Sequence, residues 1–393
     1  MTNDIVILSA VRTAIGTFGG SLSGIAPCDL GVSVAKEAIA RSGVDAAQIG
    51  QTVMGNVIHT EPRDMYLSRV TAIGAGVPET SPSLTLNRLC GSGLQAVVTA
   101  FEQISLGHCE AALAGGAESM SRAGHLLSSA RFGQKMGDVS ATDMMIGALT
   151  DPFGNGHMGI TAENVAERDG ITREQQDATA AESHRRAAHA QAEGYFDSQI
   201  LPVEVRKGRK TDTFARDEMV RSDASAEGLA TLRAAFRKDG SVTAGNASGI
   251  NDGAAALVLA RADLAGDAKP LARIVATGLG GVAPEVMRLG AVPATQQALS
   301  RAGLTVSDLD VIESNEAFAA QACAVSKQLG LDPAKVNPNG GAIALGHPIG
   351  ASGAIILTKL LYELERTGGR YGLATMCIGG GQGIAVIVEN LRR

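Results

Sequence analysis

Cys90 stands in a segment whose composition could support nucleophilic chemistry. It lies in the sequence NRLCGSG at residues 87–93, directly before an apolar pattern that predicts a helix. A thiol at a helix N-terminus faces the positive end of the helix dipole, which favours the reactive thiolate. Glycines after the thiol let a substrate approach the backbone closely. We interpret Cys90 as a candidate nucleophile; the alternatives are a buried structural cysteine and a loosely matched dinucleotide-binding glycine motif.

His347 lies in a second glycine-rich segment, GGAIALGHPIG at residues 340–350. Glycine and proline fix the backbone of such a loop without filling the space beside the imidazole, which suits a general base that faces a substrate. A nucleophile and a base form the smallest pair that covalent catalysis requires. The two segments therefore predict that Cys90 and His347 act together.

Two further segments carry reactive or polar groups after predicted strands. Cys377 begins the sequence CIGGGQG at residues 377–383, whose four glycines leave backbone N–H groups available to stabilise an oxyanion. A tight hairpin turn would explain two of these glycines but hardly all four. Asn315 follows another predicted strand; taken alone, an asparagine there is more typical of a helix cap than of a catalytic group.

An internal repeat indicates how these segments are positioned. The sequence AIARSGV at residues 38–44 resembles ALSRAGL at 298–304, an offset of 301 − 41 = 260, and residues 91–93 resemble 351–353 at the same offset. Each repeat alternates strands and helices, which predicts α/β layers with buried central strands. At Gly115 we expect a strand to end. Beyond it we expect the offset between the two repeats to slip from 260 to 379 − 115 = 264.

The repeat predicts two related halves and an insertion. Residues 1–120 with 249–268 form the N-terminal half, in which the apolar run at 254–260 returns to a buried strand, and residues 269–393 form the C-terminal half. Residues 121–248 match neither repeat and are polar, with many charges in an extended stretch. We expect this insertion to cover one face of the molecule.

Composition excludes several classes of protein. A net charge of −6 over 393 residues gives no general attraction for nucleic acid or an anionic membrane surface. No stretch approaches the apolar length of a membrane span, and no signal peptide is evident. The five cysteines are scattered without a CxxC pair, so neither a metal site nor a disulfide framework is indicated. We expect a cytoplasmic enzyme with reduced thiols.

Four motifs in combination resemble the signatures of the thiolase family: NRLCGSG, NEAFAA at 315–320, GHPIGASG at 346–353 and CIGGGQG. Residues 55–66 are similar to the β-ketothiolases of bacteria that store polyhydroxyalkanoates. The resemblance covers essentially the whole chain. It implies an α/β thiolase fold, in which two similar α-β-α halves stack as five layers (α-β-α-β-α), with an inserted loop domain that binds coenzyme A. It also implies a homotetramer built from two tight dimers.

The resemblance gives each reactive group a role. It implies that Cys90 carries the acyl group, that His347 activates this thiol, and that Cys377 exchanges the α-proton of the acetyl group. Asn315, through a bound water, would stabilise the enolate oxygen together with His347. The backbone N–H groups of Cys90 and Gly379 would form a second oxyanion hole for the acyl-enzyme.

Coenzyme A is implied as a substrate and product, without a cofactor or a metal ion. The residues that would contact it are His157, Met158, Arg221, Ala244, Ser248, Ala317 and Phe318. The sequence departs from the family pattern at Gly228, where relatives often carry a serine that contacts pantetheine. It departs again in MRLGA at residues 287–291, where Met-Gly-x-Gly-Pro is more usual, which changes the acyl pocket and the rigidity of this loop.

The implied reaction is the reversible condensation of acetyl-CoA with acetyl-CoA or a short acyl-CoA, giving a 3-ketoacyl-CoA and free coenzyme A. A decarboxylating β-ketoacyl synthase is an alternative, although that class typically pairs its cysteine with two histidines, and Cys377 occupies the second position here. A nicotinamide oxidoreductase would rest only on the weak glycine pattern. A catalytically silent scaffold is at odds with four intact motifs.

Overall fold

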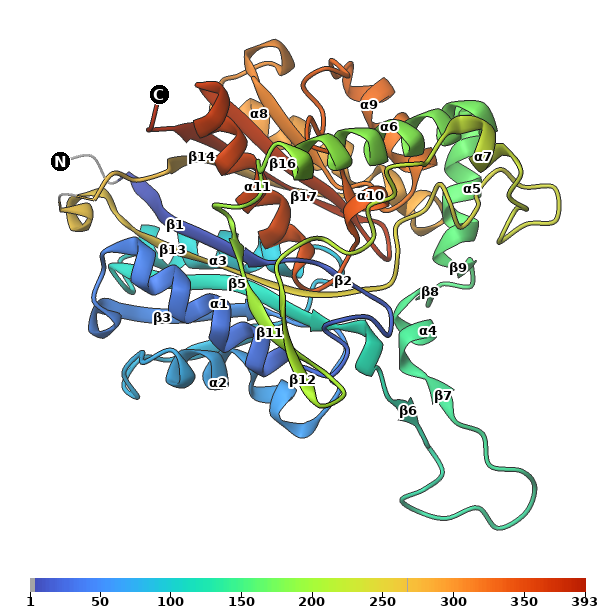
Figure 1. Ribbon diagram of the computed structural model, residues 1–393, viewed down its shortest axis with the longest axis horizontal. Helices are drawn as coiled ribbons and strands as arrows, with labels where there is room; N and C mark the ends of the chain where they lie inside the picture. The colour runs from blue at the N-terminus through green and yellow to red at the C-terminus, as the bar shows by residue number, and fades with distance from the viewer. Residues whose placement is uncertain (1–3, 267) are drawn as a thin grey trace.

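The computed structural model describes residues 4–266 and 268–393. Residues 1–3 and 267, which fall in the expected N-terminal half, lie outside this part of the chain. The main strands belong to one 11-stranded sheet, which has an N-terminal and a C-terminal section. In Figure 1 the N-terminal section, in blue and cyan, lies below the C-terminal section, in orange and red.

The N-terminal section has the strand order β4-β3-β5-β13-β1. Its strands are β1 (Ile5–Thr13), β3 (Ile49–Gly55), β4 (Ser83–Leu86), β5 (Ala111–Ser119) and β13 (Asn251–Arg261), and the short β2 (Gly16–Thr17) pairs with β13. Strand β13 lies between β1 and β5, which confirms the buried strand predicted at residues 254–260. All residues of β1 and β5 are buried, so these strands are largely apolar runs rather than alternating patterns.

The C-terminal section repeats this arrangement with the order β15-β16-β17-β14. Its strands are β14 (Ala272–Gly281), β15 (Val311–Ser314), β16 (Tyr371–Ile378) and β17 (Gln382–Asn390). Among the described residues, the two sections meet edge to edge where β1 pairs with β14, at Val6 with Arg273 and Ile7 with Ala272. Elsewhere helices separate them.

Helices complete five layers. Helices α1 (Pro27–Ser42) and α2 (Leu67–Gly74) lie on the outer side of the N-terminal section, and α8 (Ala291–Ala302) packs on β14 and β17 of the C-terminal section. Between the sections, α3 (Ser92–Ser105) packs against α11 (Ser352–Thr367). Helix α9 (Ala319–Leu329) begins within the NEAFAA motif, and the short α10 (Ala342–Leu345) directly precedes the GHPIGASG motif. The α-β-α-β-α order expected from the resemblance is confirmed.

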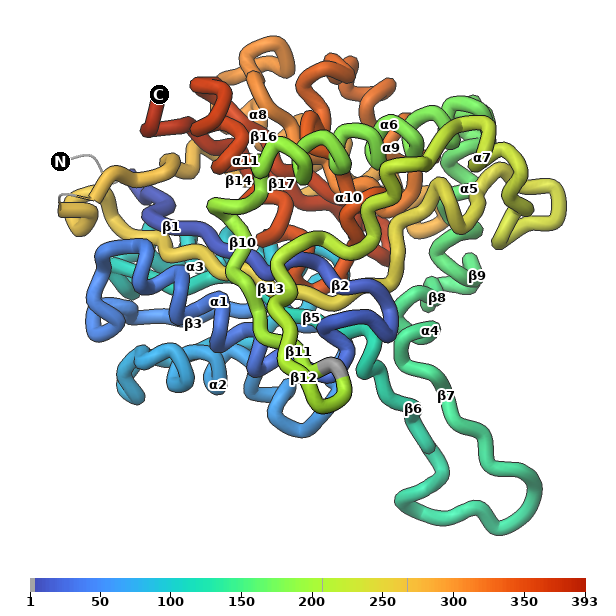
Figure 2. Tube along the Cα trace, in the orientation of Figure 1, coloured from blue at the N-terminus to red at the C-terminus, as the bar shows by residue number. Residues whose placement is uncertain are grey.

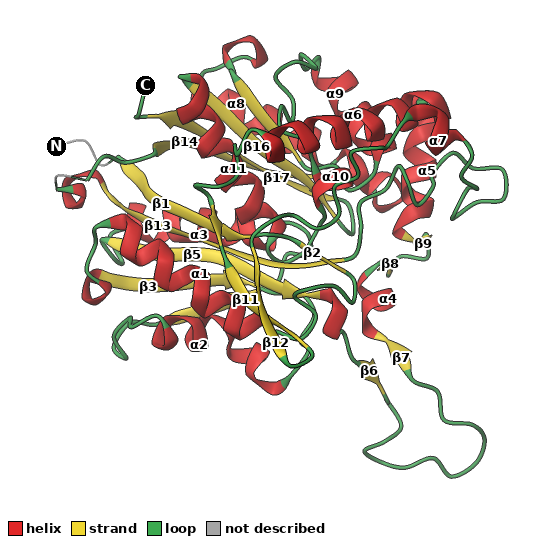
Figure 3. Cartoon of the chain, in the orientation of Figure 1, coloured by secondary structure: helices red, strands yellow, loops and turns green. Residues whose placement is uncertain are grey.

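Short 3-10 helices occur in the connections: η1 (Ala46–Gln48), η2 (Pro62–Tyr66), η3 (Met120–Arg122), η4 (Ala262–Ala265), η5 (Pro284–Leu289) and η6 (Val306–Asp308). Within the described residues, no helix combines the length and the apolar composition needed to cross a bilayer. Figure 3 shows that helix and strand alternate through both halves, whereas long loops are concentrated between them in the sequence.

The repeat keeps one register further than the sequence suggested. Thr52 pairs with Leu113 in the N-terminal section, and Ile312 pairs with Leu373 in the C-terminal section, so that 312 − 52 and 373 − 113 both equal 260. Met54 pairs with Gly115 and Ser314 pairs with Thr375 at the same offset of 260, so the expected slip at Gly115 is wrong, and β5 continues to Ser119. Glycine is needed at this position for another reason, since a Cβ there would lie 2.0 Å from the carbonyl oxygen of Ala255.

The segment between β5 and β13 lies mostly outside the sheet. Its elements are β6 (His125–Leu126), β7 (Thr142–Asp143), α4 (Met144–Ala148), β8 (Thr150–Asp151), β9 (Gly156–His157), α5 (Met158–Asp169), α6 (Arg173–Ala192), β10 (Ile200–Leu201), β11 (Val203–Lys207), β12 (Lys210–Phe214) and α7 (Ala226–Ala230). Strand β10 pairs with β1, and a fully buried ion pair between Arg12 and Asp217 (2.7 Å) fixes this segment to the core. The arm between β6 and β7 projects away from the body (Figure 2). That residues 121–248 form one inserted domain remains a prediction.

Glycines let the two central helices begin in direct backbone contact. A Cβ on Gly93, at the start of α3, would lie 2.8 Å from the backbone nitrogen of Ala354. A Cβ on Gly353, at the start of α11, would lie 2.3 Å from the backbone nitrogen of Leu94. Only glycine permits this approach. It brings the loops that precede both helices, which carry Cys90 and His347, to the same place.

Candidate active site

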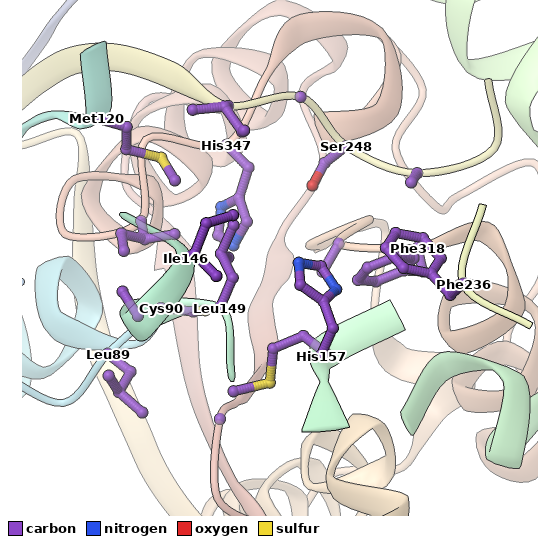
Figure 4. Close-up of a pocket in the computed structure, with 18 of the residues that line it drawn as sticks. Leu89, Cys90, Met120, Ile146, Leu149, His157, Phe236, Ser248, Phe318 and His347 are labelled. Atoms are coloured by element: carbon purple, nitrogen blue, oxygen red, sulfur yellow. The ribbon is translucent and has the colours of Figure 1, made fainter. Parts of the chain in front are cut away.

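A cavity of about 440 Å³ lies where both halves meet the long segment between β5 and β13. Its lining is mostly apolar. It includes nine of the site residues expected from the sequence: Cys90, His157, Met158, Ala244, Ser248, Ala317, Phe318, His347 and Gly379. In Figure 4, His157 lies beside Phe236 and Phe318 on one side of the cavity, and Cys90 and His347 lie on the other.

The backbone before Cys90 is held in an unusual conformation. Leu89 has a φ of 46°, in the left-handed region, which costs a residue other than glycine about 1–3 kcal/mol. The side-chain oxygen of Asn87 accepts from the Leu89 backbone N–H at 2.8 Å, and Ser92 Oγ donates to the Leu89 carbonyl at 2.7 Å. This sharp turn places Cys90 on the cavity wall immediately before α3.

Burial, rather than the helix dipole, controls the charge of Cys90. Burial raises the pKa of the Cys90 thiol to about 11, and the nearby Cys377 adds to this effect. Arg288 and the backbone N–H groups of Gly379 and of Cys90 itself oppose the rise in pKa but do not overcome it. The thiolate expected from the sequence is therefore wrong for the resting enzyme. Cys90 is a neutral thiol near pH 7 and needs a base.

His347 is oriented to be that base. Its Nδ1 lies 2.6 Å from Ser352 Oγ, and this hydroxyl donates its own hydrogen to the carbonyl oxygen of Pro348 at 2.8 Å. Because the hydroxyl hydrogen is already used, Ser352 Oγ accepts from Nδ1–H, which leaves Nε2 without a proton. The backbone N–H of His347 donates to Asn251 Oδ1 at 2.9 Å, which fixes the loop.

The imidazole of His347 stays neutral. Burial lowers the pKa of His347 to about 3, and the positive charge of Arg288 acts in the same direction. The ring is therefore unprotonated near neutral pH, and the Nε2 lone pair is free to act as an acceptor. Its side chain is part of the cavity wall together with Cys90, as the sequence predicted.

Asn315 and Cys377 lie behind the cavity lining, and each is 1% exposed. Asn315 Nδ2 lies 3.5 Å from His347 Nε2, so the asparagine and the histidine converge. Within the described residues, Asn315 Oδ1 is buried without a hydrogen-bond partner. An unpaired buried oxygen next to a catalytic base is a suitable place for an ordered water.

Cys377 is the second-last residue of β16, beside the hairpin that leads into β17. Gly380 and Gly381 have φ values of 77° and 90°, so the turn itself requires them to be glycine. Gly379 has a different reason, because a Cβ there would lie 2.9 Å from Leu89 and 3.1 Å from Met158 at the cavity wall. Burial raises the pKa of Cys377 and Arg288 lowers it, with a net rise.

Six of the seven residues expected to contact coenzyme A, all but Arg221, lie in the rest of the wall. His157 stacks on Phe236 with ring centroids 4.8 Å apart, and its Nδ1 accepts from the backbone N–H of Gly159 at the start of α5. The Ser248 backbone N–H donates to the Ala317 carbonyl at 3.1 Å, which ties the loop at 244–250 to the NEAFAA motif. These contacts preform an apolar channel toward Cys90.

Arg221 and Gly228 are not part of this wall. Arg221 lies on an exposed turn, where its backbone N–H donates to His184 Nδ1 at 3.1 Å. Gly228 lies in the short helix α7, and its N–H donates to Ser225 Oγ at 3.1 Å. The structure thus separates the expected contact at Arg221 from the residues around the nucleophile.

Sequence reasoning missed two contributions to the site. Ser352 was recognised as part of the repeat, but its hydrogen bond to His347 depends on the turn through Pro348. Arg288 was recognised only as a departure in the acyl pocket. In the structure it lines the cavity at 3% exposure, and its guanidinium carbon lies 4.1 Å from the centroid of the Phe318 ring. Among the described residues, no group of three or more His, Cys, Asp or Glu side chains could hold a metal ion.

Comparisons with known proteins agree with this geometry. The thiolase N-terminal domain model matches residues 5–263, and the thiolase C-terminal domain model matches residues 268–390. Beta-ketothiolase BktB of Cupriavidus necator is 61% identical, with the full length of both chains covered. The acetyl-CoA acetyltransferase of Escherichia coli is 51% identical and covers 98% of this chain and 99% of its own.

A solved structure of human mitochondrial 3-ketoacyl-CoA thiolase in complex with CoA matches with a TM-score of 0.96 at 42% identity, covering 99% of this chain and 98% of that one. The chain therefore belongs to the thiolase family. It is an acyltransferase that acts on acyl-CoA thioesters.

Proposed function

We propose that this chain joins acetyl-CoA to acetyl-CoA or to a short acyl-CoA through an acyl group held on Cys90, and that it also runs the reverse cleavage. The observation that carries the proposal is the convergence of Cys90, His347 and Gly379 on one cavity, with Cys377 and Asn315 directly behind. The names of the relatives add coenzyme A thioesters as the substrates.

In the first half-reaction, Cys90 Sγ attacks the thioester carbonyl carbon while its proton passes to His347 Nε2. The backbone N–H groups of Cys90 and Gly379 stabilise the oxyanion that forms. The carbon–sulfur bond to coenzyme A then breaks, and the protonated imidazole returns its proton to the leaving thiolate. The products are an acylated Cys90 and free coenzyme A.

In the second half-reaction, acetyl-CoA occupies the vacated channel. Cys377 first passes its thiol proton to His347 Nε2, and the resulting thiolate removes an α-proton from the acetyl group. The enolate oxygen is held by the protonated His347 Nε2 and a water on Asn315. The enolate carbon attacks the acyl carbon on Cys90, a carbon–carbon bond forms, and Cys90 leaves as a thiolate. Cys377 then passes its proton to this thiolate, and protonated His347 returns a proton to Cys377, which restores both thiols and the neutral imidazole.

Substrate binding follows from the shape of the wall. The apolar channel past His157, Met158 and Phe318 suits the pantetheine arm, with Ala244, Ser248 and Ala317 supplying close backbone approach. Arg221, on the exposed surface, suits the nucleotide phosphates. A decarboxylating β-ketoacyl synthase is disfavoured because Cys377 occupies the position where that class carries a histidine.

We further propose a homotetramer, a cytoplasmic location and a role in supplying 3-ketoacyl-CoA for polyhydroxyalkanoate synthesis. The arm between β6 and β7 supports assembly, because Phe132 and Met136 are 90% and 89% exposed. The cytoplasm suits a nucleophilic thiol that must stay reduced. The similarity of residues 55–66 to β-ketothiolases supports the biosynthetic role. Sedimentation of the purified chain at several concentrations tests the assembly.

Thiolysis of acetoacetyl-CoA by coenzyme A, without any nucleotide, tests the proposed reaction. The enolate absorbance of acetoacetyl-CoA should fall, and acetyl label should be recovered on the peptide containing Cys90. Cys90→Ser should abolish both, since an alcohol is far less ionised than a thiol. Label on Cys377, or cleavage that persists in the serine variant, would overturn the assignment of the nucleophile.

A further inference from the structure

Arg288 is a buried cation that lacks an anionic partner. It is 3% exposed, and the described residues contain no carboxylate within ion-pair distance of its guanidinium. Removing such a charge from water is costly unless it is paired, and the negative charge of a bound ligand is one way to pair it. The nearest ionisable groups, the thiols of Cys90 and Cys377, are neutral in the resting enzyme and do not compensate the charge.

The guanidinium is nevertheless held in place. Nη2 donates to the carbonyl oxygen of Met158 at 3.0 Å, and the planar group lies over the Phe318 ring. Within the described residues, Nε is buried and has no hydrogen-bond partner. Besides the ring and the Met158 carbonyl, the guanidinium contacts the Cys377 side chain. The unpartnered Nε is part of a planar set of donors, and such a set can bind a carboxylate through two bonds.

The same side chain lines the cavity that contains Cys90 and His347. Its charge is the only one contributed by a lysine, arginine, aspartate or glutamate to this lining, as far as the described residues show, and the remaining wall is mostly apolar. An acyl chain attached to Cys90 therefore shares this cavity with Arg288. An anionic group at the end of that chain would pair with Arg288, whereas a methyl group would leave the arginine unpaired.

We propose that Arg288 selects acyl-CoA substrates whose short acyl chain ends in a second carboxylate. This inference rests on the proposed thiolase reaction and specifies its substrate class. In the cleavage direction, a 3-ketoacyl-CoA with a terminal carboxylate and coenzyme A give acetyl-CoA and an ω-carboxyacyl-CoA. The terminal carboxylate stays ionised and paired with Arg288 while the acyl group is on Cys90.

The test compares two substrates of equal length, 3-ketoadipyl-CoA and 3-ketohexanoyl-CoA, which differ in a terminal carboxylate or methyl group. The wild-type chain should have the higher kcat/KM for 3-ketoadipyl-CoA. Arg288→Met should lower the ratio of the two kcat/KM values by about tenfold to a hundredfold, the range expected for hydrogen bonds to a charged group. Arg288→Lys keeps the charge but not the two-bond geometry. Its ratio of the two kcat/KM values should therefore lie between those of the wild type and Arg288→Met.

Arg301→Met is the matched control, because Arg301 is an exposed arginine on α8 that donates to the Thr277 carbonyl away from the cavity. Its substrate ratio should equal that of the wild type. A wild-type preference for 3-ketohexanoyl-CoA would overturn the proposal, and this comparison needs no variant to fold. If Arg288→Met lowers kcat/KM equally for both substrates, the proposal is also overturned. Arg288 would then act on the thiols of Cys90 and Cys377 instead of on the acyl chain. Acetoacetyl-CoA thiolysis by the wild type separates failure of this inference from failure of the thiolase reaction itself.

Discussion

The Nδ1 atom of His347 lies 2.6 Å from Ser352 Oγ, and this one contact determines which nitrogen of the ring faces the reaction. Ser352 begins α11, so the same helix that separates the two sheet sections also fixes the tautomer of the base. A ring held as Nδ1–H presents Nε2 as an acceptor, whereas the other tautomer would present a donor and could not take a proton from Cys90.

Ser352→Ala should therefore impair catalysis more than binding. Losing a group that orients a catalytic histidine typically costs about tenfold to a hundredfold in activity. We expect kcat for acetoacetyl-CoA thiolysis to fall within this range, with KM nearly unchanged. Ser352→Thr, which keeps the hydroxyl, should recover most of the rate. Equal rates for the alanine and threonine variants would show that the hydroxyl does not orient the ring.

The raised pKa of Cys90 predicts how the free enzyme reacts with iodoacetamide. A thiol with a pKa of about 11 is mostly protonated at pH 7, and its thiolate fraction grows about tenfold per pH unit below that pKa. Alkylation of Cys90, followed by peptide mapping, should rise steadily from pH 7 to 9 without a plateau. A plateau near pH 7 would show that the helix dipole and Arg288 outweigh burial. The groups that face this thiol are Cys377, His347 and Arg288.

His347→Ala separates resting ionisation from catalysis. It should slow the acylation of Cys90 by acetoacetyl-CoA by about 10²- to 10⁴-fold, the usual contribution of a general base. The steady rise of alkylation with pH should persist, because the resting imidazole is neutral and sets no charge beside the thiol. Rapid-quench measurement of acylation at pH 7 gives the first quantity. An acylation rate within threefold of wild type would remove His347 from the role of base.

Cys377→Ala should divide the two half-reactions. The variant should still accept labelled acetyl on Cys90, since the first half-reaction does not use Cys377. It should fail to exchange the methyl protons of acetyl-CoA with deuterium from the solvent, which mass spectrometry of recovered acetyl-CoA would detect. Exchange at the wild-type rate would contradict the proposed carbon acid chemistry.

Arg221→Ala should weaken binding of the whole thioester. An exposed charge contact contributes on the order of 1 kcal/mol and is screened by salt, so KM should rise several-fold with little change in kcat. The effect should shrink at high ionic strength. A short pantetheine thioester that lacks the nucleotide serves as the control and should be indifferent. If it suffers equally, Arg221 supports the fold rather than the phosphates.

Much of this architecture could be read from local patterns. The repeat at an offset of 260 predicted the matched strands and helices, and the motif loops predicted which residues would meet, because glycines needed for backbone contact leave a visible signature. The strand end at Gly115 was predicted wrongly because a glycine pair looks the same whether it turns the chain or admits a neighbour. The predicted ionisation of Cys90 was also wrong, because the start of a helix is visible in a sequence but the depth of burial is not.

The charge environment depends on contacts between distant segments. Ser352 and Arg288 become informative only when α11 and η5 are packed beside the cavity, and no spacing in the sequence encodes the 4.1 Å separation of Arg288 from the Phe318 ring. An arginine in a loop is ordinarily solvated. Its burial here follows from the fold around it.

Strand β13 has a consequence for how the polypeptide is made. Ile5 pairs with Arg261, and Asp252 pairs with Ser119, so this interior strand of the N-terminal section comes from residues synthesised long after its neighbours. Until that strand leaves the ribosome, β1 and β5 each have an open edge, and open apolar edges promote aggregation. Nascent chains that stop before residue 251 should therefore depend on chaperones, whereas chains released after residue 261 can close this part of the sheet.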